Sequence, residues 1–539
     1  MPIIIENSRA QGLYVRLLTL CVVLVVLARL FFIGEGTMAF PDETRYQSSL
    51  IAAKSLLNGN WQTFAAKVTS TSGRPGDAFV RLVPALLQNA AYTAFGLNLN
   101  SPDSLMIPVI INWLVLIVSA YIFYKVAHLL LRSELLGVMA TLIYAGLINT
   151  NVYMRHVLPY DFAMCLMLYV LYTVLRQKQQ GRAWNYAFFA KVGFISVFLI
   201  TVYPGFYMAP FIVLAVLLDD RNPFVLLKKY FAGIVVYGLA GTVALLIFEL
   251  ISRLGGTSYL ISSFHLAHTI DQGSYEEGFT FLVKYLYQIE GFIGTSLVAL
   301  FVVYVIYLGG NLIKSFKDNS ELDDLDKLVL VVAAFYFLHG FCTYFVHKMV
   351  FYGRLMHPFM PFVVLGAVSV IQRLSIPPLR TALVFALPLI SLVSFGLFFK
   401  EYRVLDYPYD VLSQYHLNTN TASKVRYVNE VGKSPGFKYD IPEPARLNEA
   451  STAPTTDSLT LINFAFLFPM KHLTPAPDLA KLGSQVLFDG PHFLNFRAYQ
   501  FEGFTIAERE LIRASKFHFQ IRTRGLSGST PTGGVTPLN

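Results

Sequence analysis

The feature that most constrains this chain is a series of long apolar runs. Runs of about 20 residues recur along the first 400 positions, and each is long enough to cross roughly 30 Å of hydrocarbon. A bilayer offers the backbone no water, so such a run must be a helix or part of a closed barrel. These runs are rich in Leu, Val and Phe and show no alternation, which excludes a barrel. The sequence therefore predicts an all-α polytopic membrane protein.

We expect about eleven spanning helices. The first runs from Leu13 to Ile33, and because it is longer than the apolar region of a usual signal peptide we interpret it as a retained signal anchor. The later spans are expected near residues 107–127, 135–152, 158–175, 187–202, 204–218, 230–251, 291–313, 328–346, 356–372 and 379–398.

Composition and charge support a membrane protein. Hydrophobic residues make up 55% of the chain and charged residues only 14%, against about 25% charged in an average soluble domain. The chain has a net charge of +9, but its Lys and Arg are scattered through short connections, so we expect no nucleic-acid partner. Cys21, Cys165 and Cys342 each lie inside an apolar run without metal-type spacing, which is typical of small core residues.

The basic residues also predict an orientation, because positively charged connections face the cytoplasm. The cytoplasmic connections contain Arg132, Arg176, Lys178, Arg182, Arg221, Lys228, Lys229, Lys314, Lys317, Arg373 and Arg380. The outer face then carries residues 35–106, 153–157, 252–290, 347–355 and the tail from residue 401. We expect a multi-pass protein of the bacterial inner membrane, with its outer face in the periplasm.

The chain divides into a membrane part and a tail. Residues 1–400 are predicted to form the transmembrane catalytic domain, and residues 401–526 a small α+β domain on the outer face. Residues 527–539 are rich in Gly, Ser, Thr and Pro and are predicted to be disordered. Within the first outer loop, residues 35–106, the segments Arg45 to Leu57 and Ala78 to Leu97 are expected to be helices lying along the membrane surface.

The first candidate site lies where the chain leaves the first span. Asp42 and Glu43 are adjacent, and Arg45 and Tyr46 follow them. A purely structural role is also open: Asp42 can cap the next helix, Glu43 can stabilise its first turn, and Arg45 can reach the membrane surface.

Two more polar clusters are expected on the same face. In the first, Arg155 and His156 precede Asp161 at the start of the fourth span. A carboxylate near the membrane boundary is costly unless it is paired or hydrated, so Asp161 is a functional candidate, with pairing to Arg155 or His156 as the alternative. The second cluster contains His347, Lys348, Arg354 and His357, and its alternative role is the anchoring of span ends.

Together these clusters suit transfer from a lipid-linked phosphate. A carboxylate can take the proton of an incoming hydroxyl or hold a metal that helps the phosphate to leave. Arg and Lys stabilise the negative charge that grows on the phosphate. The hydrocarbon tail of such a donor explains why the site belongs in a membrane protein.

The chain resembles the GT-C glycosyltransferases, in the branch of the protein O-mannosyltransferases and the lipid A aminoarabinose transferases. The resemblance covers roughly residues 10–400 and rests on the order and sidedness of short motifs. They are Asp42-Glu43-Thr44-Arg45-Tyr46, Phe95-Gly96 after a surface helix, Asp161 at the fourth span, and Arg354 followed by Pro358 and Pro361. The chain departs from the family pattern at Gly73-Arg74-Pro75-Gly76-Asp77, at Val202-Tyr203-Pro204-Gly205 and at Leu355.

The resemblance implies a GT-C-like fold and an inverting transferase that moves one sugar from a polyprenyl-phosphate donor to a hydroxyl of a protein, lipid or glycan. It implies Asp42 as the catalytic carboxylate, Asp161 as its partner and Glu43 as the third acid. The candidates for the donor phosphate are Arg45, Arg74, Arg155, Lys348 and Arg354, and the further candidates are His156, His357 and Tyr46. A divalent Mg or Mn ion, if one is used, would be held by Asp42 and Asp161. The alternatives are a transporter or flippase of lipid-linked glycans, and a surface-glycan ligase or polymerase.

Overall fold

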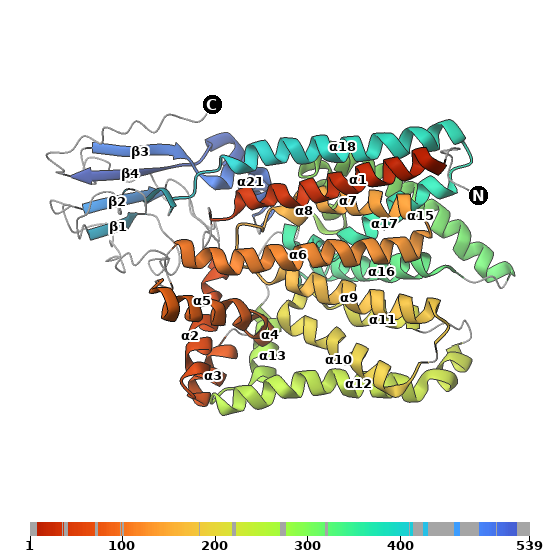
Figure 1. The fold of residues 1–539 in the computed structure, drawn as a ribbon, viewed down its shortest axis with the longest axis horizontal. Coiled ribbons are helices and arrows are strands. Elements are labelled where there is room, and N and C mark those ends of the chain that lie inside the picture. Colours follow the sequence, from red (N-terminus) through yellow and green to blue (C-terminus); the bar gives the residue numbers. More distant parts are fainter. Residues whose placement is uncertain are drawn as a thin grey trace.

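The computed structural model describes most of the chain. The described residues are 8–34, 36, 41–70, 74–97, 99, 102–182, 184–217, 223–269, 276–318, 322–408, 410–412, 415, 424–428, 458–463, 485–502 and 504–524. Long helices pack lengthwise into one bundle, and a small sheet lies at one end of it (Figure 1). The tail segment 527–539, for which disorder is predicted, lies outside the described residues.

Each predicted span is occupied by a helix. Among the described residues, six helices are long and apolar enough to cross a membrane, which is the pattern of a multi-pass integral membrane protein. These six are α1 (Ser8–Ala28, continued by η1, Arg29–Phe32), α6 (Pro102–Leu131), α12 (Pro223–Leu254), α15 (Gly291–Asp318), α16 (Asp324–Tyr344) and α18 (Pro377–Arg403). The other predicted spans are α7 (Glu134–Gly146), α9 (Tyr160–Gln179), α10 (Tyr186–Val202), α11 (Ala209–Leu217, preceded by η3, Pro204–Phe206) and α17 (Met360–Arg373). These five are shorter or less apolar, so the count of eleven spans stays a prediction.

Two predicted spans have different ends in the structure. The span expected at 135–152 ends at Gly146, and a separate short helix, α8 (Ile148–Asn151), follows it. The carboxylate of Glu290 accepts hydrogen bonds from the amides of Ile148 at 2.7 Å and Asn149 at 2.8 Å. These bonds satisfy the first amides of α8 from another part of the chain, which explains how the helix can restart there. The span expected at 356–372 begins only at Met360, because a 3₁₀ turn, η5 (Gly353–Met356), precedes it.

The first outer loop packs as a unit at one end of the bundle (Figure 1). It consists of η2 (Pro41–Arg45), α2 (Tyr46–Leu57), α3 (Trp61–Val68), α4 (Pro75–Val80) and α5 (Leu82–Phe95). Its small core includes Tyr46, Leu50, Ala53 and Leu82, which pack with Val109 of α6. The helix α5 ends at Gly96, whose φ of +69° is a left-handed conformation that glycine adopts without strain. The segment predicted at Arg45 to Leu57 is helical, whereas the one predicted at Ala78 to Leu97 is divided by a turn at Arg81 into the end of α4 and α5. Their position along the membrane surface stays a prediction.

In the described part of the chain, three short helical elements lie between α12 and α15. They are α13 (Tyr259–Thr269), η4 (Gly278–Thr280) and α14 (Phe281–Gln288). The tail contributes β1 (Lys424–Val428), β2 (Ser458–Asn463), β3 (Gln485–Pro491), η8 (Phe493–Asn495), α20 (Arg497–Gln500), α21 (Ile506–Ser515) and β4 (His518–Arg524).

The described strands of the tail form one mixed sheet in the order β1-β2-β4-β3. β1 and β2 are parallel, and β4 is antiparallel to both of its neighbours. Thr505 and Glu508 form a capping box at the start of α21, which explains why the helix begins there. The sheet lies at the same end of the bundle as α2–α5, so the first outer loop and the tail are neighbours (Figure 1).

Candidate functional site

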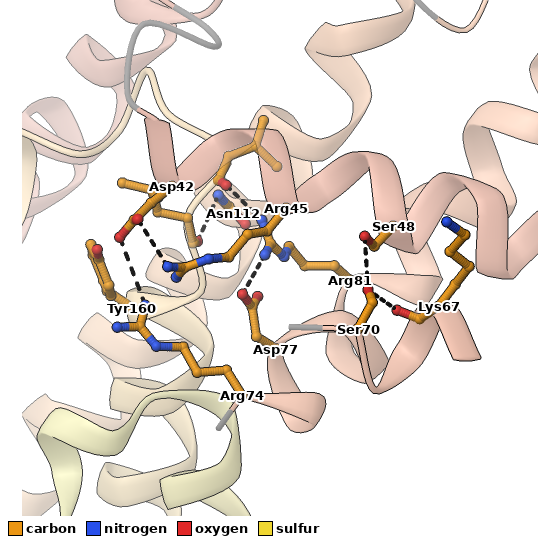
Figure 2. Close-up of polar contacts among 12 residues, drawn as sticks. Asp42, Arg45, Ser48, Lys67, Ser70, Arg74, Asp77, Arg81, Asn112 and Tyr160 are labelled. Atoms are coloured by element: carbon orange, nitrogen blue, oxygen red, sulfur yellow. Dashed lines mark hydrogen bonds and ion pairs between the residues drawn. The ribbon is translucent and has the colours of Figure 1, made fainter. Parts of the chain in front are cut away.

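Asp42 lies at the centre of a group of cations at this end of the bundle. Its carboxylate pairs with Arg354 at 2.9 Å, with Arg45 at 3.1 Å and with Arg74 at 3.7 Å. Figure 2 shows Arg45 and Arg74 directed at Asp42, with Tyr160 beside them. Arg354 follows Asp42 by 312 positions in the chain. The structure thus brings together four of the residues that the sequence singles out.

Each of these cations comes from a different element. Arg45 ends η2, Arg74 precedes α4, and Arg354 lies in η5. The Arg354 guanidinium also donates to the hydroxyl of Tyr160 at 3.3 Å, and that of Arg74 lies over the ring of Tyr203 at 5.1 Å. The aromatic rings orient the guanidinium groups while leaving their N–H edges toward the carboxylate.

The electrostatics keep Asp42 ionised. Burial raises the pKa of its carboxyl, but the surrounding guanidinium groups prevail, so the pKa lies well below its ordinary value. Arg354 has the largest of these effects, followed by Arg45 and Arg74. The side chain of Asp42 is 20% exposed, so it is not fully covered by the surrounding residues.

The residues around Asp42 do not fit a divalent cation. Three guanidinium groups already occupy the directions in which metal ligands would be needed, and they would repel a cation. In the described part of the chain, no group of three His, Cys, Asp or Glu side chains could hold a metal ion. We therefore derive no step through the Mg or Mn ion that the resemblance suggests. To hold that ion, Asp161 would have to lie beside Asp42.

Glu43 is buried and connects parts of the chain, and it does not face solvent. Its side chain is fully buried, accepts a hydrogen bond from the amide of Val157 at 2.7 Å and contacts His156 Nδ1 at 3.1 Å. The other ring nitrogen of His156 contacts the hydroxyl of Tyr499 at 2.8 Å. Glu43 and His156 therefore join the first outer loop to the segment before α9 and to the tail.

Three other candidates are also buried away from Asp42. Arg155 lies over the ring of Tyr402 at 4.5 Å and donates to the carbonyl of Arg403 at 3.3 Å. Tyr46 donates from within the loop core to Gln88. His357 contacts the side chain of Asn149 at 3.0 Å. Lys348 is half-buried in the connection before η5 and is not among the cations that contact Asp42.

Asp161 does not join the Asp42 cluster in the described structure. It is 7% exposed, and its charge acts on Arg29 and Tyr144 instead. Arg29 is fully buried and donates to the carbonyl of Ala145 at 2.5 Å. Its Nε and Nη1 atoms and the Tyr144 hydroxyl have no hydrogen-bond partner among the described residues. Arg29, Tyr144 and Asp161 thus form a second, inner polar cluster. Tyr160, and not Asp161, contacts Arg354, which pairs with Asp42.

Sequence reasoning missed several residues of the site. Glu502 in the tail accepts a hydrogen bond from the Arg354 amide at 3.0 Å, and its carboxylate lies 3.5 Å from the Arg354 side chain. Burial raises the pKa of Glu502, and the charge of Arg354 opposes this. Asp77 and Arg81 form a buried pair beside the cluster. No pattern around Glu502 indicates this contact, whereas Arg29, a charge inside an apolar run, could have been found.

Comparison with protein-family models and with curated proteins finds no match for this chain. The function is therefore inferred from the geometry of the site and from the resemblance of its short motifs.

Proposed function

We propose that this protein is an integral membrane glycosyltransferase that moves a sugar from a polyprenyl-phosphate donor to a hydroxyl-bearing acceptor. One observation carries the proposal: a part-exposed carboxylate, Asp42, lies among Arg45, Arg74 and Arg354. Guanidinium groups match a phosphate in both charge and geometry. The donor's hydrocarbon tail would lie in the bilayer that the long apolar helices fit. We further propose the bacterial inner membrane as the location, with the site on the periplasmic side.

The proposed chemistry is a single displacement at the anomeric carbon. The acceptor oxygen forms the new bond to that carbon while its proton passes to the Asp42 carboxylate. The bond from the anomeric carbon to the phosphate oxygen breaks, and the polyprenyl phosphate leaves with the electron pair. The guanidinium groups stabilise the charge that develops on the leaving phosphate. Attack from the face opposite to the phosphate inverts the configuration.

Donor binding would also prepare the base. A carboxylate whose pKa is far below neutrality is a weak proton acceptor. The guanidinium groups that lower the pKa of Asp42 are the groups that a donor phosphate would attract. As they turn toward the phosphate, the proton affinity of Asp42 rises. The base would therefore be strongest when the donor is in place.

The test is transfer from a synthetic polyprenyl-phosphate sugar by purified Asp42→Asn protein in liposomes. This change keeps the shape of the side chain and removes its charge, so folding should survive while transfer falls by about 10²–10⁴-fold. The matched control is Asp103→Asn, which alters an exposed carboxylate in the first turn of α6 and should keep full activity. An Asp42→Asn protein with the activity of the wild type would contradict the proposal and favour the transporter alternative.

A further inference from the structure

The segment between α8 and α9 is held by hydrogen bonds from several directions. Asn112 of α6 donates to the carbonyls of His156 at 3.2 Å and Leu158 at 3.3 Å. Arg81 donates to the carbonyl of Val157 at 2.8 Å, and Glu43 accepts from the amide of the same residue at 2.7 Å. The segment thus connects the first outer loop to the helix bundle.

The tail contacts the same segment at several points: Tyr153 donates to the carboxylate of Glu502, and the hydroxyl of Tyr499 contacts His156. Tyr499 of α20 is fully buried, and its oxygen lies 2.8 Å from His156 Nε2, 2.7 Å from the hydroxyl of Tyr407 and 3.0 Å from that of Tyr402. Tyr402 belongs to the end of α18 and Tyr407 follows it. The Tyr499 hydroxyl is therefore shared by the tail, the last helix of the bundle and the segment before α9.

These contacts belong to one continuous series of hydrogen bonds. Tyr402 gives its single hydroxyl proton to the carbonyl of Val152 at 2.6 Å, because a carbonyl can only accept. The Tyr499 hydroxyl contacts both Tyr402 and His156 Nε2, and the direction of the bond to His156 depends on the tautomer of its ring. The contact between His156 Nδ1 and Glu43 needs a proton on either atom. The hydrogen bonds therefore run without a gap from Glu43 through His156, Tyr499 and Tyr402 to the carbonyl of Val152.

From this geometry we propose that the tail is a positioning element of the Asp42 site and acts through Tyr499, His156 and Glu43. Glu43 directly follows Asp42 within η2, so the bonds that hold the Glu43 carboxylate also set the direction of Asp42. The Tyr499 hydroxyl fixes the ring of His156, and the ring fixes Glu43. In this arrangement Tyr499 touches no substrate and Glu43 takes no proton from the acceptor. This inference rests on the proposed function only for the reaction at the Asp42 site. The contacts among Tyr499, His156 and Glu43 do not depend on that reaction.

The test is hydrogen–deuterium exchange of full-length Tyr499→Phe protein in detergent. The change removes one hydroxyl and keeps the ring. Exchange of the Val157 amide, which is bonded to Glu43, should become about tenfold faster, the effect expected from one lost buried hydrogen bond. The matched control is Tyr415→Phe, which removes a hydroxyl that donates to Leu487 within the tail at 2.9 Å and should leave Val157 unchanged.

A double variant decides whether the three residues act as one chain. Glu43→Gln alone should also speed exchange at Val157, and Tyr499→Phe added to it should have little further effect, because both changes break the same chain. The proposal is wrong if the two changes multiply each other's effect on the exchange rate of Val157, or if that rate is unchanged. It is also wrong if exchange becomes equally faster throughout the protein. With a polyprenyl-phosphate donor, Tyr499→Phe should lower kcat about tenfold with KM nearly unchanged. If even the wild type transfers no sugar, the proposed function fails, while the exchange result still decides the positioning.

Discussion

At the scale of single residues, the rotation of α9 about its own axis decides whether Tyr160 or Asp161 reaches the Asp42 site. Tyr160 and Asp161 are neighbours at the start of α9, and consecutive side chains on a helix point about 100° apart. Tyr160 therefore contacts Arg354 beside Asp42, whereas Asp161 faces the buried Arg29. The sequence places an acid at the opening of the fourth span but does not fix the rotation of that helix. The role of Asp161 as a catalytic partner stays a prediction, and its charge interaction with Arg29 suggests a structural role that can be tested.

We predict that Asp161→Asn destabilises the protein, because it leaves the charge of Arg29 buried without its partner. Asp161 acts on Arg29 through its charge and not through a hydrogen bond, so we expect a cost below the roughly 3–5 kcal/mol that is typical of breaking a buried ion pair. Thermal unfolding in detergent should therefore occur at a clearly lower temperature. Adding Arg29→Met should restore part of the loss, since the remaining buried charge is then gone. If Asp161→Asn unfolds like the wild type but transfers no sugar, the carboxylate acts in catalysis and the structural role is wrong.

At the scale of elements, the position of Arg74 depends on how closely α4 approaches α10. Gly76 lies in the first turn of α4, two residues after Arg74. A Cβ atom at Gly76 would lie 2.7 Å from the backbone nitrogen of Val202 at the end of α10, a distance that real Cβ atoms do not show. The glycine thus permits backbone contact between the outer loop and the bundle. Arg74 enters the Asp42 cluster from this contact.

We predict that Gly76→Ala moves α4 away from α10 and weakens the site more than it weakens the fold. Overpacking of this kind costs about 1–3 kcal/mol, and it should also displace Arg74 from Asp42. Sugar transfer should fall at least tenfold, which corresponds to about 1.4 kcal/mol in the barrier. The control is Gly396→Ala in α18, where a Cβ meets nothing within 4 Å. That change should leave both the unfolding temperature and the transfer rate close to those of the wild type.

The sequence predicts elements better than it predicts contacts between them. The apolar runs locate the helices, because burial in lipid demands about 20 residues wherever a helix crosses. They do not locate the break at Leu147, which depends on Glu290 from far along the chain. Asp42, Arg45 and Arg354 are recognisable as charges at a membrane boundary. Glu502 is not, because the segment around it has no periodicity that fixes its fold.

At the scale of the whole molecule, the polar chemistry is separated between the two ends of the bundle. The helices of the first outer loop, which also contains Asp42, and the sheet lie at one end (Figure 1). The other end is held by different ion pairs, including Lys178 with Asp324 at 2.7 Å and Arg373 with Asp326 at 2.8 Å. Lys178 and Arg373 belong to the connections whose positive charge predicts the cytoplasmic side. The separation agrees with a site that works on the outer side of a membrane.

We therefore predict that the first outer loop and the tail are labelled from the same side of the membrane. Single cysteines replacing Lys54 of α2 and Glu510 of α21, both exposed, should react with an impermeant maleimide added to intact cells. The protein's own Cys21, Cys165 and Cys342 are first changed to Ser. A cysteine replacing Gln180, which is exposed after α9 at the other end, should react only after the membrane is opened. If Lys54→Cys and Glu510→Cys react from opposite sides, the chain crosses the membrane an odd number of times between these two residues. The arrangement of Asp42, Arg354 and Glu502 in one site would then be wrong, because these residues could not meet on one face.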